Sequence, residues 1–155
     1  MQIIFKKGAI KNTITCNRPD GTATWMQAEP FMVMHDLTHY VVETQFDLHD
    51  SFYGLLARGW DVTDFENKQK IKSSDIPGEG ICTEILVGLL LTERNDGQEM
   101  SDFNTVFSDS CSKLQLTCTP PEDDVLRKLR MGLDEIINKW KFLPIGSTFV
   151  VNFPA

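Results

Sequence analysis

The fold of this chain is decided first by residues 13–26, Thr13-Ile14-Thr15-Cys16-Asn17-Arg18-Pro19-Asp20-Gly21-Thr22-Ala23-Thr24-Trp25-Met26. Polar and apolar side chains alternate before the Pro19-Asp20-Gly21 segment, and a second arm returns after it. That segment is a strong turn signal, because proline presets φ and Asp-Gly accepts a tight turn. The pattern therefore predicts a β-hairpin over residues 12–27.

The two ends of the chain add strands to this hairpin. Ile3-Ile4-Phe5 predicts a strand before it, and residues 147–153 predict a strand at the other end. We expect the last strand to join the N-terminal sheet, which would otherwise have an exposed edge. The predicted fold class is α+β: a small antiparallel sheet from the N-terminal hairpin and the C-terminal strand, packed on four to five helices. The length, residues 1–155, corresponds to a single globular domain.

Helical periodicity fills the middle of the sequence. The expected helices run from Met34 to about Gln45, from after Asp47 to Arg58, over Ile81–Arg94, over Ser101–Leu114, and onward from Thr119. Asp47 is the expected N-cap of the second helix. Thr119-Pro120-Pro121-Glu122 predicts a capping box at the start of the last helix. Ile81–Arg94 is apolar nearly all round, which indicates a central buried helix.

Residues 61–80 form a long polar connection that ends in Gly78-Glu79-Gly80. Connections of this length in a compact domain are either mobile or functional. We expect this one to be the most mobile internal segment, with Gly78-Glu79-Gly80 as a hinge, and to act as a lid near the histidines. The alternative is a flexible connector without a role. Limited proteolysis is expected to cut first within Asn67–Ser74.

The charge of the chain excludes several classes of partner. Its net charge is −7, and residues 31–66 hold seven acids and one base. A nucleic-acid surface needs clustered Lys and Arg, so no nucleic-acid partner is expected. No apolar run has the length of a signal peptide or a membrane span, which predicts a cytoplasmic protein with no membrane contact. The partner classes that these exclusions leave are a second copy of the chain (a homo-oligomer) and another protein.

The four cysteines contain no Cys-x-x-Cys pair. Cys111 and Cys118 are close enough in sequence to meet, but the cytoplasmic setting predicts reduced, partly buried thiols.

All three histidines fall between His35 and His49. On a helix His35, His39 and Glu43 share one stripe, with successive side chains about 6 Å apart. At this spacing two imidazoles can bind one divalent metal ion, with zinc as the first candidate. The pattern is reminiscent of the zinc-peptidase motif His-Glu-x-x-His, but Asp36 stands where that motif has its general base. Because Asp is one methylene shorter, we do not expect a peptidase.

Three residues compete for the remaining metal positions: Glu43, His49 and Glu84. Three ligands from one helix are strained, because three successive turns extend over about 11–12 Å. His49 opens the next helix and can fold back. Glu84 lies in an apolar helix, where an unpaired carboxylate is costly, unless it occupies an exposed strip of that helix.

Two functional classes follow from the histidines. A metal with a water in an open position would support metal-assisted hydrolysis. The alternative is a non-enzymatic binding or assembly module in which the histidines are structural and bonded to carboxylates or carbonyls. No complete set of catalytic residues is visible, so none is assigned.

A resemblance covers most of the chain. It is carried by Met34-His35-Asp36-Leu37-Thr38-His39-Tyr40-Val41-Val42-Glu43, Phe52-Tyr53-Gly54-Leu55, Gly59, Trp140, Leu143-Pro144 and Gly146. These residues resemble an uncharacterised family of small bacterial proteins with a His-Asp-Leu-x-His-x-x-Val-Glu helix. The resemblance implies a bacterial cytosolic setting, and no activity is attached to it.

Overall fold

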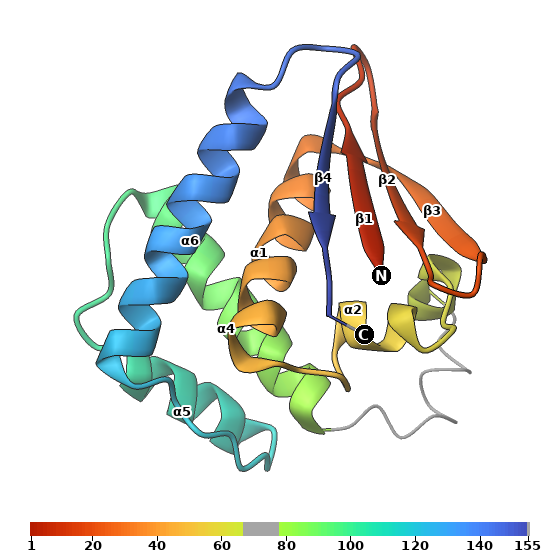
Figure 1. Cartoon of the computed structure of the whole chain (residues 1–155). Coiled ribbons are helices and arrows are strands. Elements are labelled where there is room, and N and C mark those ends of the chain that lie inside the picture. The colour runs from red at the N-terminus through yellow and green to blue at the C-terminus, as the bar shows by residue number, and fades with distance from the viewer. Residues whose placement is uncertain (67–77, 155) are drawn as a thin grey trace.

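A computed structural model describes residues 1–66 and 78–154 of the chain and contains one antiparallel sheet (Figure 1). Its strands are β1 (Gln2–Lys6), β2 (Asn12–Asn17), β3 (Ala23–Ala28) and β4 (Thr148–Asn152). Their order in the sheet is β3-β2-β1-β4. The first strand of the chain, β1, and the last, β4, thus lie side by side. The predicted α+β class is confirmed.

The hairpin and the terminal strand pair as the sequence predicts. Strands β2 and β3 pair from Asn12↔Ala28 to Asn17↔Ala23. Gly21 closes the turn with φ +87°, and its N–H donates to the carbonyl of Arg18 at 3.1 Å. Strand β4 pairs antiparallel with β1. It therefore covers the edge of β1 that faces away from the hairpin.

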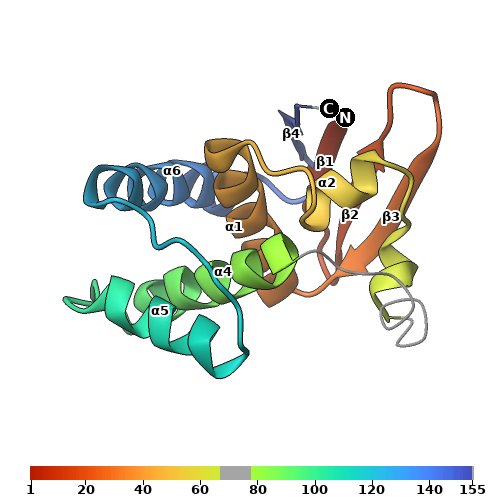
Figure 2. The same cartoon turned by 90° about the horizontal axis from the view of Figure 1, so that it is seen from below.

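The helices lie on one side of this sheet, as Figure 2 shows for α1, α4, α5 and α6. Their bounds are α1 (Pro30–Phe46), α2 (Phe52–Ala57), α4 (Gly78–Asp96), α5 (Phe103–Lys113) and α6 (Asp123–Phe142), with a 3₁₀ helix η1 (Val62–Glu66). Helix α1 contacts the sheet as well as α4 and α6, and α5 packs on α4. Ile3 and Phe5 of β1 and Leu37 of α1 are fully buried between these layers. The central position of α1 places its histidines inside the domain.

Several helix boundaries differ from the predictions. Asp47 is not the N-cap of the second helix: it ends α1 in the left-handed conformation (φ 54°), and Ser51 precedes α2. The predicted capping box at Thr119 is also wrong, because α6 begins at Asp123 with Glu122 as N-cap. The residue before a proline is biased away from helical dihedrals, so Pro120 and Pro121 together keep the preceding residues extended.

The connection 61–80 is only partly as predicted. Val62–Glu66 forms the 3₁₀ helix η1, and the expected hinge Gly78-Glu79-Gly80 is instead the first turn of α4. The segment Asn67–Ser74, where proteolysis is expected, lies outside the described residues. The lid therefore stays a prediction.

The expectation of four reduced cysteines is wrong. Cys82 of α4 and Cys118 of the α5–α6 connection form a disulfide, with their Cα atoms 5.8 Å apart. Cys16 and Cys111 are free and buried. The two bonded residues are 36 positions apart, so their pairing depends on how α4 packs against the α5–α6 connection. No helix in the described part of the chain is long and apolar enough to cross a membrane.

Candidate metal site

Helix α1 carries His35 and His39 one turn apart, and α4 presents Glu84 to both of them. The His35 Nε2 atom lies 3.4 Å from Glu84 Oε2, and the His39 Nε2 atom lies 3.1 Å from Glu84 Oε1. The two imidazole centroids are 4.6 Å apart. One ligand atom from each of the three residues lies within 4.8 Å of the others. The packing of α1 on α4 thus gathers a His–His–Glu set from two helices.

A second carboxylate orients each imidazole from behind. His39 Nδ1 is 2.9 Å from Glu43 Oε1, and His35 Nδ1 is 3.3 Å from Asp36 Oδ1. Glu43 is itself held by α2, because the N–H groups of Tyr53 and Gly54 donate to its Oε2 at 2.9 and 3.1 Å. A carboxylate on Nδ1 favours the tautomer with its proton there and leaves the Nε2 lone pair free. In the neutral imidazoles, the Nε2 atoms near Glu84 would therefore offer their lone pairs to a metal ion.

Glu84 lies at ion-pair distance from both imidazoles. Among the described residues, the buried Nε2 atom of His39 has no hydrogen-bond partner, and neither has Oδ2 of Asp36. An unsatisfied buried polar atom costs roughly 1–3 kcal/mol. Such a cost calls for an explanation at His39, whose side chain is fully buried. A cation placed between the three ligand groups would remove it.

The electrostatics of the cluster favour a cation. Burial lowers the pKa of His35, but its contacts with Asp36 and Glu84 outweigh this and raise the pKa to about 9. The pKa of His39 is also raised, by Glu43 and Glu84 against an opposing effect of burial. Burial raises the pKa values of Asp36 and Glu43. The pKa of Glu84 is held well below its usual range by the two histidines, although burial opposes this. Three carboxylates thus surround two imidazoles and stabilise positive charge on them.

The sequence-predicted candidates fall into three places. His35, His39 and Glu84 come together, whereas Glu43 lies behind His39 on the Nδ1 side. His49 is outside this cluster, half-exposed, with its Nε2 atom 3.5 Å from Oδ1 of Asp47.

The supporting contacts were missed at the sequence level. The i,i+4 spacing of His39 and Glu43 places their side chains within reach of each other. No local sequence signal points to the two N–H donors from α2. Asp36 does not occupy the place of a peptidase base, because it is buried behind His35.

Apolar groups surround the open side of the cluster. The Phe52 ring centroid lies 5.3 Å from that of His39. A small pocket of about 140 Å³ is lined by Glu84 together with Ser51, Phe52, Leu55, Phe65, Gly80 and Ile81. A ligand bound beside Glu84 would therefore meet a largely apolar wall.

Comparisons of this chain with protein-family models, with curated proteins and with solved structures find no match. The function is therefore inferred from the geometry of the site, and the resemblance drawn from the sequence stays a prediction.

Proposed function

We propose that this protein binds one divalent metal ion, zinc in the first place, through His35 Nε2, His39 Nε2 and Glu84. One observation carries the proposal: both imidazoles are oriented through Nδ1 by carboxylates, while their Nε2 atoms lie 3.4 and 3.1 Å from the carboxylate of Glu84. Histidine ligands of metals nearly always donate their other N–H to such a partner.

The ligand set also favours a reaction class. Structural zinc sites are closed by four protein ligands, whereas catalytic sites use three and leave a position for water. His–His–Glu supplies three, and the pocket lined by Glu84 lies beside it. Zinc lowers the pKa of a bound water to about 7. We therefore propose metal-assisted hydrolysis as the reaction class, in a cytoplasmic setting.

The competing function is a non-enzymatic module with structural histidines. It is favoured by the fully buried His39–Glu43 pair, which ties α1 to the N–H groups of α2. Glu84 discriminates between the two functions. Its side chain is 55% exposed, so the fold does not need it in the way that it needs Glu43.

The test is metal binding by protein purified without a metal-affinity tag. Elemental analysis and zinc titration calorimetry of the disulfide-bonded protein should find one ion per chain. Glu84→Ala should weaken zinc binding about a hundredfold or more while the far-ultraviolet circular dichroism stays that of wild type. His49→Ala is the matched control, because this histidine belongs to the same region but not to the cluster, and its affinity should equal that of wild type.

Two results would contradict the proposal. Wild-type protein that stays metal-free after loading with zinc, manganese and nickel, with no thermal shift, rules out the site. Equal zinc affinity in Glu84→Ala and wild type rules out this ligand set. If Glu84→Ala is unaffected while His35→Ala plus His39→Ala unfolds the chain, the structural function is favoured instead.

A further inference from the structure

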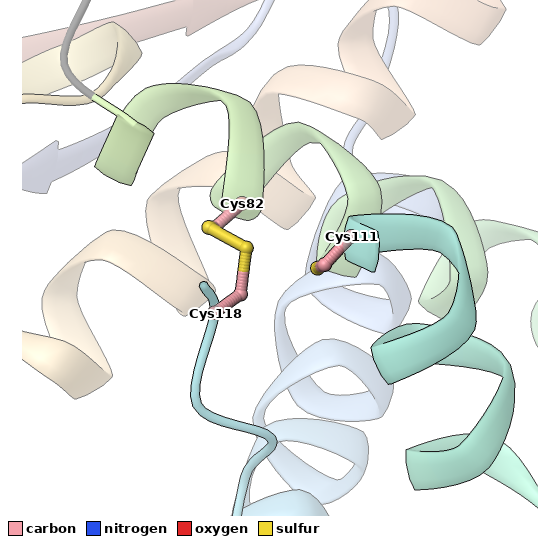
Figure 3. Close-up of side chains that lie close together, drawn as sticks. All are labelled: Cys82, Cys111 and Cys118. Carbon is pink, nitrogen blue, oxygen red and sulfur yellow. A yellow bond between two sulfur atoms is a disulfide. The ribbon is translucent and has the colours of Figure 1, made fainter. Parts of the chain in front are cut away.

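Three of the four cysteines meet on the far side of α4 from Glu84. Cys82 is two residues before Glu84, and two helical residues point about 200° apart. Figure 3 shows the Cys82–Cys118 disulfide with Cys111, at the end of α5, pointing toward it. The three sulfur atoms lie within 4.8 Å of one another. This cluster is separate from the histidines and has no part in the function proposed above.

Cys111 is the unusual member of the cluster. It is 1% exposed and has no disulfide partner, although two other sulfurs lie next to it. When the disulfide is reduced, α4, α5 and the α5–α6 connection each supply one thiol to the same place. The three thiols together form a ligand set. Thiolates are the ligands that select zinc and copper(I) over harder ions.

The disulfide can be reached from solvent. Cys82 and Cys118 line a surface pocket of about 410 Å³, together with Phe46, Leu86, Phe107 and Leu116. A thiolate of a dithiol reductant entering there attacks one sulfur, the S–S bond breaks, and a mixed disulfide forms. The second thiol of the reductant displaces the remaining cysteine. Two electrons have then passed to the protein, the reductant leaves as a disulfide, and Cys82 and Cys118 are free.

We propose that reduction of the Cys82–Cys118 disulfide creates a metal site in which the thiolates of Cys82, Cys111 and Cys118 bind one zinc-class ion. Zn–S bonds of about 2.3 Å in tetrahedral geometry place neighbouring sulfurs about 3.8 Å apart. The present cluster is within about 1 Å of that arrangement once the disulfide sulfurs separate. Cys118 lies between α5 and α6, outside regular secondary structure, so it is free to adjust. The fourth position faces the pocket and is open to water or a ligand.

Compartment decides which form is present. Disulfides are rare where glutathione and thioredoxin keep thiols reduced. In the cytoplasmic setting expected from the sequence, the reduced three-thiol form would therefore be the one that meets metal. In an oxidising compartment the disulfide form would hold no ion at this place.

Cobalt(II) is the probe, because its thiolate charge-transfer band in the near ultraviolet arises only from sulfur ligands and not from the histidine cluster. The full chain is reduced with a phosphine, which adds no competing thiol. Reduced wild type should show the band with one thiolate-bound ion per chain, and oxidised wild type should show none. Cys111→Ser should lose about a third of the band and bind at least about tenfold more weakly. Cys16→Ser removes the other buried free thiol and should match wild type.

A second measurement uses no variant. Zinc should protect Cys82 and Cys118 of the reduced protein, which line the pocket, from alkylation, as read by mass spectrometry, and release of zinc by a chelator should restore labelling. Absence of the cobalt band in folded, reduced wild type would overturn the proposal, as would a Cys111→Ser band equal to that of wild type. Alkylation of Cys82 and Cys118 at the same rate with and without zinc would overturn it independently.

Discussion

The Nδ1 atom of His39 lies 2.9 Å from Oε1 of Glu43, and both side chains are completely shielded from solvent. The other oxygen of Glu43 accepts the N–H groups of Tyr53 and Gly54. Burying an ionisable pair is costly unless its remaining hydrogen-bonding capacity is satisfied. The hydrogen-bonding capacity of Glu43 is satisfied, whereas the Nε2 atom of His39 has no hydrogen-bond partner among the described residues. The proposed metal ion would complete the bonding of this imidazole.

Glu43→Gln should reduce zinc affinity about ten- to a hundredfold without removing a ligand. The amide oxygen of the new side chain is expected to keep the N–H groups of Tyr53 and Gly54, which turns its NH₂ group toward His39 Nδ1. That nitrogen must then accept, so the imidazole proton moves to Nε2 and blocks the metal. Calorimetry measures the affinity and nitrogen NMR of His39 reads the tautomer. Unchanged affinity in a folded variant would show that Glu43 does not orient His39.

The metal-free protein should lose stability between about pH 6.5 and 9. The pKa of His35 is raised from 6.5 to about 9 in the folded state, so its contribution is complete below 6.5 and disappears as the pH rises through the folded value. The contribution is at most about 3 kcal/mol. Urea unfolding of chelator-treated protein at several pH values measures it.

Zinc should reverse this trend, because the ion needs deprotonated imidazoles and stabilises more as the pH rises. His35→Gln is the comparison for the metal-free measurement and should flatten the pH dependence. A metal-free wild type that is as stable at pH 9 as at pH 6 would contradict the raised pKa.

Reduction of the Cys82–Cys118 disulfide should lower the free energy of unfolding by about 4 kcal/mol. The disulfide closes a loop of 36 residues, and the lost chain entropy of the unfolded state has this size. Urea denaturation with and without a phosphine reductant measures the difference. The free energy of unfolding of the Cys82→Ser plus Cys118→Ser variant should not change with the reductant. A wild type whose stability is equally unchanged would show that the disulfide is not formed.

Cys16 should resist alkylation in the folded protein. Burial in the sheet, with a further contribution from the charge of Asp36, raises the pKa of its thiol to about 12, so almost no thiolate is present near pH 8. Unfolding in urea should make it react at the rate of an ordinary thiol. The measurement is mass spectrometry of iodoacetamide-treated protein, and rapid labelling in the native state would show that β2 opens.

Gly54→Ala should destabilise the fold and weaken zinc binding, although Gly54 is not a ligand. A Cβ at this position would lie 2.3 Å from the carbonyl oxygen of His49, so α2 must shift away from Glu43. Gly88→Ala is the matched control, because a Cβ there meets nothing within 4 Å, and it should stabilise by up to about 1 kcal/mol. Thermal unfolding and zinc calorimetry compare the two variants. If the two variants show the same stability and zinc affinity, α2 does not support the site.

Local signals account for what could be predicted about the fold. The hairpin depends on the turn at Pro19-Asp20-Gly21 and on alternation, both of which act over a few residues. The apolar face of α6 follows from a 3.6-residue period, and the buried Leu129 and Leu133 lie on it. Boundaries were less predictable, because Pro120 and Pro121 act on their neighbours as well as on themselves. The capping-box pattern that starts at Thr119 therefore predicted the wrong start for α6.

For the candidate site, the sequence by itself determined that His35 and His39 share a helical face, since that relation needs only the helix period. Tertiary structure alone decided that Glu84 lies against their Nε2 atoms, that Glu43 lies behind His39, and that Cys82 bonds Cys118. Periodicity reports which face of an element is buried but carries no information on which distant element covers it. That choice depends on how α1, α4 and the α5–α6 connection pack together, which no short stretch of residues contains.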